Sequence, residues 1–304
     1  MKNKTRTDED VVKYLKSRFI EDLRAASAYL TVAKGREKNV GKSNDVDQGN
    51  GVSTNGIHDA LTFMDRFVQD FLCLQISREF PGISVLLEED STVRRLFSPD
   101  SNLGTILIDP IDGTKQFSEG GPDYSILITY IYEGEIRYCA GIYPESGDLL
   151  ESYCGSLITD VGEPKLKPLS QIDSVACHYR ITKDNNVKWQ YALERAGKNL
   201  VWNGNGYYTN LSAARLVLEG EAEAFVCVYT AAHDALAPVE LIRSAGGVAR
   251  RYSVGTDWSS SRRIDYSFHD LQNSCFDQGS PRVRLIGARD DMIANTLEKI
   301  LDSA

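Results

Sequence analysis

Two aspartates lie three residues apart, directly after a short apolar segment. Residues 104–108 are mostly apolar and β-branched, which is typical of a buried strand. Asp109 and Asp112 follow this segment, and Pro110 between them is expected to end the strand because it has no N–H to donate. A helix is expected to start at 115–117, so the turn offers free backbone N–H groups beside two carboxylates. Such a turn can bring a hard cation and a phosphate together, and an ordinary acidic turn explains the same residues equally well.

Three other acids stand at informative places in the predicted elements. Glu88 is the first of three consecutive acids after an apolar strand at 83–87, and such acids repel one another unless they are exposed or a cation neutralises them. Asp65 lies inside a helix predicted over 58–80, where by itself it is interpreted as a solvated surface acid. Asp234 precedes an apolar helix, and capping that helix is its simplest role. A helix N-terminus would also aim this carboxylate at a ligand, so both interpretations stay open.

The composition excludes several classes of partner. The chain has 304 residues, of which 42% are hydrophobic and 25% charged, and its net charge of −9 argues against a nucleic acid polymer as partner. Nothing in the sequence approaches the roughly 20 apolar residues that span a bilayer, and the first residues lead into acidic ones rather than an apolar signal segment. The six cysteines are scattered and the four histidines lack the spacing of zinc ligands. We therefore expect a cytoplasmic protein with reduced thiols and no membrane partner.

Hydrophobic periodicity divides the chain into two halves. A helix predicted over 8–33 and the helix over 58–80 precede three predicted strands, which indicates an antiparallel sheet covered by these helices. The three strands are predicted at 124–132, 136–143 and 148–153. The polar segment 34–56 is either a disordered insertion or a flap that closes near the site.

The second half alternates strands and helices, which favours a layered α/β arrangement. A loop-rich junction at 155–170 places the boundary between residues 1–155 and residues 156–304. Strands are predicted near 173–177, 224–228, 248–252 and 282–287, and helices near 185–196, 211–219, 234–245 and 289–302. Residues 253–281 are polar and irregular.

Four motifs in this order resemble the inositol monophosphatase superfamily, the lithium-sensitive and magnesium-dependent phosphatases. They are Thr62-Phe63-Met64-Asp65, Leu87-Glu88-Glu89-Asp90, Asp109-Pro110-Ile111-Asp112-Gly113-Thr114, and His233-Asp234 through Ala245-Gly246-Gly247. Together they are far more specific than any one of them. The resemblance implies an α/β (α+β) fold, a layered α/β/α/β/α sandwich of the inositol monophosphatase and fructose-1,6-bisphosphatase type.

The resemblance also assigns roles to individual residues. It implies that two or three Mg²⁺ ions, or Mn²⁺ in their place, are held by Glu88, Asp109, Asp112, Asp234 and the carbonyl of Ile111. Asp65 would hold a metal-bound water, Thr114 would help to activate the attacking water, and the backbone of Gly113 and Thr114 would bind phosphate, so that Glu88, Asp65 and Thr114 form the catalytic set. The chemistry agrees, because metal ions held by carboxylates neutralise phosphate charge and lower the pKa of a bound water. Most of these ligands belong to the first half, and Asp234 and the substrate contacts belong to the second.

The substrate is the least determined part of this prediction. Candidate substrate contacts are Asp112, Thr209, Asn210 and Cys227. Cys227 stands where inositol enzymes usually carry a Glu that holds ring hydroxyls, and His233 stands where they usually carry Trp, which we interpret as a packing replacement. The expected substrate is therefore a small phosphorylated metabolite such as an inositol or sugar phosphate. The alternatives are a 3′(2′),5′-bisphosphate nucleotidase, a histidinol-phosphate phosphatase and a non-catalytic phosphate-binding relative. The resemblance further implies a homodimer.

Overall fold

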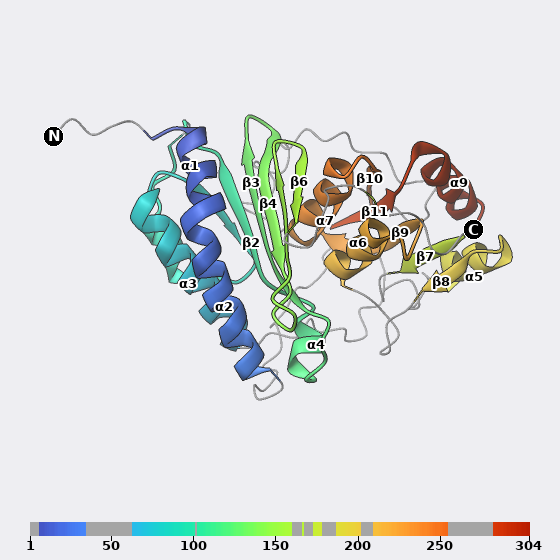
Figure 1. Ribbon diagram of the computed structural model, residues 1–304, viewed down its shortest axis with the longest axis horizontal. Helices are drawn as coiled ribbons and strands as arrows, with labels where there is room; N and C mark the ends of the chain where they lie inside the picture. Colours follow the sequence, from blue (N-terminus) through green and yellow to red (C-terminus); the bar gives the residue numbers. More distant parts are fainter. Residues whose placement is uncertain are drawn as a thin grey trace.

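Helices and sheets alternate in layers across the molecule (Figure 1). The computed structural model describes residues 6–34, 63–100, 102–159, 166, 173–177, 187–201, 209–254 and 282–304. Apart from Lys34, Ser253 and Val254, the predicted loop at 34–56 and the irregular segment at 253–281 lie outside these residues.

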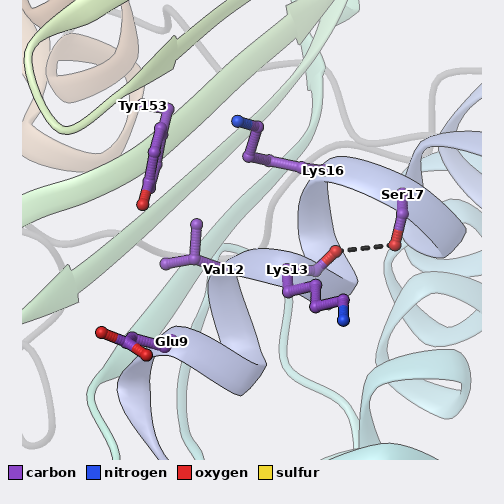
Figure 2. A pocket seen from close by; sticks show the side chains of 6 residues that line it. All are labelled: Glu9, Val12, Lys13, Lys16, Ser17 and Tyr153. Atoms are coloured by element: carbon purple, nitrogen blue, oxygen red, sulfur yellow. Dashed lines mark hydrogen bonds between the residues drawn. The ribbon is translucent and has the colours of Figure 1, made fainter.

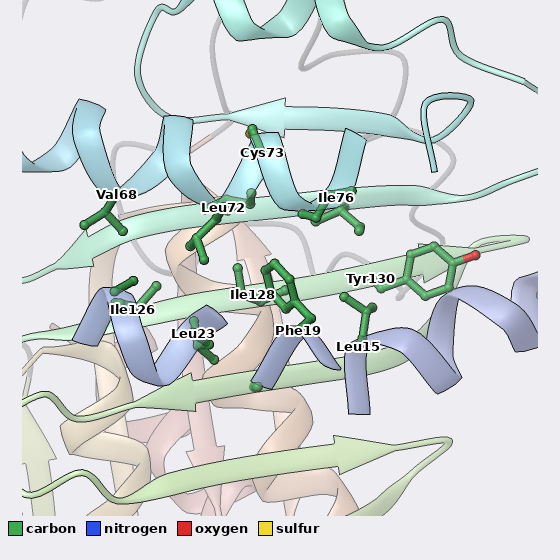
Figure 3. Close-up of a cluster of buried hydrophobic side chains, with 14 of the residues drawn as sticks. Leu15, Phe19, Leu23, Val68, Leu72, Cys73, Ile76, Ile126, Ile128 and Tyr130 are labelled. Atoms are coloured by element: carbon green, nitrogen blue, oxygen red, sulfur yellow. The ribbon is translucent and has the colours of Figure 1, made fainter. Parts of the chain in front are cut away.

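The N-terminal helices cover one face of the first sheet. The helix predicted over 8–33 is present as α1 (Asp8–Tyr14) and α2 (Ile20–Ala33), joined by a π-helical turn, η1 (Leu15–Phe19), that hydrophobic spacing does not predict. The second helix, α3 (Phe63–Glu79), packs beside α2 and against the same sheet. Leu15, Phe19 and Leu23 from the first helix meet Val68, Leu72 and Ile76 from α3 over the side chains of the sheet (Figure 3).

The first sheet has six strands in the order of the sequence. Strand β1 is parallel to β2, and each later strand is antiparallel to the one before it. The strands are β1 (Ser84–Leu87), β2 (Thr105–Asp112), β3 (Ser125–Tyr132), β4 (Glu135–Ile142), β5 (Leu149–Tyr153) and β6 (Ser156–Thr159), with a 3₁₀ turn, η2 (Thr92–Leu96), between β1 and β2. Strand β6 lies inside the segment for which the sequence predicts only a loop-rich junction.

Strand β2 does not end at Pro110, contrary to the prediction. The backbone stays extended to Asp112, and the ladder with β3 shifts register between Asp109, opposite Leu127, and Asp112, opposite Ser125. The irregular part of the ladder falls at Pro110, where no N–H is available, so the proline interrupts pairing without ending the strand. Helix α4 (Thr114–Ser118) then begins one residue earlier than predicted.

The second sheet has the strand order β10-β11-β9-β7-β8 and carries helices on both faces. Its strands are β7 (Ser174–Cys177), β8 (Asn199–Val201), β9 (Ala224–Ala231), β10 (Val248–Ser253) and β11 (Arg282–Ala288). Its helices are α5 (Val187–Arg195), α6 (Asn210–Glu219), α7 (Ala232–Ser244) and α9 (Asp291–Asp302). All of these were predicted except the short strand β8.

Helices α6 and α7 form the middle layer between the two sheets (Figure 1). Helix α7 contacts β2 to β6 of the first sheet and β9 to β11 of the second, while α5 and α9 cover the outer face of the second sheet. The order of layers is therefore helix, sheet, helix, sheet, helix, which confirms the predicted α/β/α/β/α sandwich. The boundary near residue 155 stays a prediction. Within the described part of the chain, no helix combines the length and apolar character needed to cross a membrane.

Candidate active site

The predicted metal ligands come from three elements that meet between the two sheets. Strands β1 and β2 are parallel and in register from Ser84 opposite Thr105 to Leu87 opposite Ile108, so Glu88, which follows β1, comes next to Asp109, which lies within β2. Asp234 lies in the first turn of α7, which follows β9 directly. The positions predicted for Glu88, after a strand, and Asp234, at the start of a helix, are therefore confirmed, whereas Asp109 lies inside its strand rather than after it.

Asp109 is the most strongly perturbed carboxyl of the group. Burial raises its pKa well above the ordinary value, and the charges of Glu88, Asp234 and Asp112 raise it further. One Asp109 carboxylate oxygen accepts the backbone N–H of Ile111 at 3.1 Å. The fold therefore brings Glu88, Asp112 and Asp234 within electrostatic range of Asp109.

Asp112 shows the same perturbation with partial compensation. Burial and the charge of Asp234 raise its pKa, and the backbone N–H of Leu211 and the Thr209 hydroxyl lower it in part. Asp112 Oδ2 lies 3.3 Å from the Leu211 nitrogen and 3.4 Å from Ser125 Oγ, both of which donate to it. Asp112 thus links the end of β2 to the first turn of α6, a contact between the two halves.

Asp234 is held in its ionised form. Burial alone would raise its pKa, but His233, Arg282 and the Thr230 hydroxyl outweigh burial and lower the pKa below the ordinary range. His233 Nε2 lies 2.8 Å from Asp234 Oδ1, and Thr230 Oγ1 donates to Oδ2 at 3.0 Å. Interpreting His233 as a packing replacement is therefore incomplete, because it pairs with Asp234. The capping role predicted for Asp234 is wrong, since the N-cap is Ala231 and the helix start has no side-chain cap.

Asp65 is fully buried, so its interpretation as a solvated surface acid is wrong. Helix α3 packs it toward the end of β2, where Thr114 Oγ1 lies 3.3 Å from Asp65 Oδ1 and 3.0 Å from the Ile111 carbonyl oxygen. The hydroxyl has one hydrogen and can donate it to either acceptor. The structure thus brings together the Asp65, Thr114 and Ile111 of the predicted catalytic and metal set.

Gly113 adopts the left-handed conformation, with φ of 94°, at the N-cap of α4. A Cβ at this position would lie 2.7 Å from the Asp123 carbonyl oxygen and 2.7 Å from Thr209 Cγ2. Only glycine avoids both the strained φ and this collision. The turn that carries the backbone N–H groups of Gly113 and Thr114 is therefore packed tightly against both the 122–124 loop and the start of α6.

The carboxylate donors suit a hard divalent cation such as Mg²⁺ in type and in electrostatics. A cation would relieve the repulsion that raises the pKa of Asp109 and Asp112. As the side chains stand, however, no three His, Cys, Asp or Glu residues in the described ranges form a ready-made group around one point. Hydrogen bonds to Leu211, His233 and Thr230 fix the orientation of the Asp112 and Asp234 carboxylates.

The predicted substrate contacts divide into two groups. Thr209 caps α6, and Asn210 starts this helix beside Thr230 and Asp234. Cys227 is fully buried in the apolar cluster between the sheets, which argues against the predicted substrate contact. Strand β9 directs this small side chain into the core, so position 227 offers a substrate neither a carboxylate nor an exposed thiol.

Sequence reasoning missed two residues that hold the site together. Asp123 accepts the backbone N–H of Thr209 at 3.0 Å and the hydroxyl of Ser212, and so anchors the start of α6 to the first half. Thr230 bridges Asn210 and Asp234. A single aspartate in a turn and a single threonine in a strand carry no spacing signal from which these contacts could be inferred.

A surface cavity of about 300 Å³ lies away from these acids (Figure 2). It is lined by Glu9, Val12, Lys13, Lys16, Ser17 and Tyr153, on the first helix and the end of β5. Lys16 lies over the Tyr153 ring, 4.1 Å from its centroid. Side chains at this cavity include none of the predicted ligands, and we locate the chemistry at the buried acids rather than here.

Comparisons with known proteins point the same way. The sequence model of the Inositol monophosphatase family matches residues 15–275. A fructose-1,6-bisphosphatase/inositol-1-monophosphatase of Thermotoga maritima is 31% identical over 118 residues, 39% of this chain and 39% of that protein. A histidinol-phosphatase of Chlorobaculum parvum is 27% identical over 202 residues, 63% of this chain and 72% of that protein. A crystal structure of an IMPase/NADP phosphatase complexed with Mg²⁺ and phosphate superposes with a TM-score of 0.66 at 14% identity, covering 97% of this chain and 96% of the other, which shows a shared fold.

Proposed function

The chain belongs to the inositol monophosphatase family, whose members are phosphatases, and we propose that it hydrolyses a small phosphorylated metabolite with the help of divalent metal ions. The observation that carries this proposal is the convergence of Glu88, Asp112 and Asp234 on the buried Asp109, whose pKa their charges raise. Repulsion between buried charges destabilises the folded protein unless a cation offsets it. The related IMPase/NADP phosphatase, solved with Mg²⁺ and phosphate, supports Mg²⁺ as the cation.

In this proposal the acids and one carbonyl hold the metal. Glu88, Asp109, Asp112, Asp234 and the Ile111 carbonyl would ligate Mg²⁺, two or three ions in number, with Mn²⁺ as an alternative. Bound Mg²⁺ would supply positive charge for the phosphate oxygens and lower the pKa of a bound water.

The remaining residues move the proton and hold the phosphate. Thr114 Oγ1, 3.3 Å from Asp65 Oδ1, can accept a hydrogen bond from the attacking water while it donates its own hydrogen to Asp65. Glu88 would share in orienting this water. The N–H groups of Gly113 and Thr114 at the start of α4 would donate to the phosphate oxygens, because they have no partner within the helix.

Substrate recognition is proposed to fall on the start of α6, with Asp112 and Thr209 beside Asn210. Asn210 Oδ1 is buried and has no hydrogen-bond partner among the residues that the structure describes. Such an acceptor suits a hydroxyl or ammonium group of the substrate. An inositol or sugar phosphate offers hydroxyls and histidinol phosphate offers an ammonium, so we propose the class of small phosphomonoesters. A cytoplasmic homodimer is proposed from the same family membership.

A phosphate-release screen tests the proposal. Inositol 1-phosphate, fructose 1,6-bisphosphate, histidinol phosphate and 3′-phosphoadenosine 5′-phosphate are incubated with the protein and Mg²⁺, in parallel with excess EDTA. We expect Mg²⁺-dependent release from at least one compound and none from the Asp234→Asn variant. Release that persists in EDTA, or in Asp234→Asn at the wild-type rate, contradicts the proposal. No release from any compound would favour a non-catalytic phosphate-binding protein.

A further inference from the structure

A chain of hydrogen bonds connects the start of α6 to the Asp234 carboxylate. Asn210 Nδ2 lies 2.9 Å from Thr230 Oγ1, and Thr230 Oγ1 lies 3.0 Å from Asp234 Oδ2. Asn210 and Thr230 are both buried, so solvent does not compete for the bond between them. Thr230 lies near the end of β9, paired with Val283 of β11, which gives its hydroxyl a fixed place in the sheet.

The donors in these two hydrogen bonds are arranged in one direction. The Thr230 hydroxyl donates its single hydrogen to Asp234 Oδ2. The remaining lone pairs of Thr230 Oγ1 then need a donor, and only the amide NH₂ of Asn210 can supply one at that distance. Donors therefore run from Asn210 through Thr230 to Asp234, and each bond polarises the next.

The start of α6 is also fixed to the first half of the molecule. The Leu211 N–H donates to Asp112 Oδ2 at 3.3 Å, and Asp123 accepts from the Thr209 backbone and the Ser212 hydroxyl. One helical turn thus contacts Asp112 through its backbone and Asp234 through a relay of two side chains. The relative position of these two carboxylates, one from each half, depends on this turn.

We propose that Asn210 is a positioning residue that acts through Thr230 to orient the Asp234 carboxylate for metal binding. The inference rests on the proposed function, since it assigns Asp234 as a metal ligand. Oδ2 is held by Thr230 and Oδ1 faces His233, so loss of the Thr230 hydroxyl frees the carboxylate to rotate. Residues that orient metal ligands in this way typically change metal affinity or activity about 10-fold to 100-fold when they are replaced.

Calorimetric titration with Mg²⁺ in the absence of substrate measures this effect directly. Thr230→Val keeps the volume of the side chain and removes the hydroxyl, and we expect Kd to rise about 10-fold. Thr230→Ser restores the hydroxyl and is expected to stay within about threefold of wild type. Thr129→Val, at a buried threonine of β3, is the matched control and is expected to leave Kd unchanged. The Mg²⁺ concentration for half-maximal hydrolysis should rise with Kd in Thr230→Val, while turnover recovers at saturating Mg²⁺.

A double-variant cycle tests whether Asn210 acts through Thr230. Asn210→Leu alone should weaken Mg²⁺ binding, and adding it to Thr230→Val should cause no further loss, because the relay is already broken. The proposal is overturned if Thr230→Val binds Mg²⁺ within twofold of wild type, or if the two losses multiply. Thermal unfolding without metal verifies that each variant is folded, and Thr230→Ala replaces Thr230→Val if the latter is not. A wild-type protein that binds no Mg²⁺ defeats the proposed function and this inference together, whereas intact wild-type binding with unaffected variants defeats only the inference.

Discussion

Replacing Asp109 with Asn should stabilise the metal-free protein while it destroys the metal site. Asp109 is buried among Glu88, Asp112 and Asp234, and both burial and these charges raise its pKa. Asn keeps the carbonyl oxygen that accepts the Ile111 N–H at 3.1 Å, so the local turn survives the exchange. The substitution therefore removes a repelled charge at almost constant shape.

The direction of the change in stability follows from the raised pKa of Asp109. For a carboxyl whose folded pKa is raised, the cost to the folded state is absent below its unfolded pKa and grows as pH rises toward the folded pKa. We expect Asp109→Asn to raise the free energy of unfolding at neutral pH by about 0.5 to 2 kcal/mol, the range usual for a stabilising single substitution. This amounts to a rise in Tm of about 2 to 4 °C for each kcal/mol. The gain should be smaller near about pH 5 than near about pH 8.

Mg²⁺ should reverse this order of stability. A ligand present at about 100 times its Kd stabilises the folded state by about 2.7 kcal/mol, and only the wild type retains the full ligand set. We expect differential scanning fluorimetry in EDTA to place Asp109→Asn above wild type, and the same measurement in Mg²⁺ to place it below. Asp100→Asn, which changes an exposed aspartate, is the matched control and should shift Tm little in either buffer.

Two results would refute this reasoning. An Asp109→Asn protein that is less stable than wild type in EDTA would show that Asp109 is not repelled in the metal-free fold. A Mg²⁺-induced rise in Tm equal to that of the wild type would show that Asp109 does not contribute to cation binding. The pKa values of Asp112 and His233 are also raised, so both groups also make the folded protein less stable as pH rises. Asp109→Asn should therefore reduce the pH dependence of the unfolding free energy without abolishing it.

Four further predictions concern the proposed chemistry and assembly. Chelation should abolish phosphate release, added Mg²⁺ should restore it and Li⁺ should inhibit it; full activity after exhaustive chelation would contradict the mechanism. Thr114→Val should lower kcat at least about 100-fold and Thr114→Ser much less, because the hydroxyl bonded to Asp65 orients the attacking water; equal kcat values would assign Thr114 to structure alone. Since Cys227 supplies no carboxylate, kcat/KM for inositol 1-phosphate should exceed that for other sugar phosphates by less than about 100-fold. Light scattering at micromolar concentration should show a dimer, and a monomer would refute that expectation.

The ends of the strands are the part of the site that the sequence predicts best. Glu88 and Asp109 each follow an apolar segment of strand length, and neighbouring parallel strands necessarily end at one edge. Their meeting therefore follows from two local patterns and one rule of sheet geometry. Alternating apolar strands and amphipathic helices also favour a layered arrangement of the second half, whereas the order of five layers is implied only by the family resemblance.

Residues whose environment depends on tertiary contacts escape this reasoning. Asp65 is interpreted as exposed from its own helix, yet α3 packs it against the turn that carries Thr114. Pro110 is expected to end β2, but a shift of register accommodates the missing donor. The relay from Asn210 to Thr230 joins residues of two elements, and no spacing along the chain distinguishes these two side chains from other buried polar groups.

Helix α7 explains how a fold can hold four repelling acids together. Residues 235–242 of this helix are all buried and, apart from Glu240, apolar, and the helix contacts strands of both sheets. Burial of each large apolar side chain of this helix, such as Leu236, Leu241 and Ile242, favours the middle layer by about 1.5 to 3 kcal/mol before the entropy cost of ordering it. This packing places Asp234 in the site, where His233 and Thr230 hold its carboxylate. Core packing therefore outweighs the repulsion that the neighbouring acids exert on Asp109, and a cation bound as proposed would relieve that repulsion.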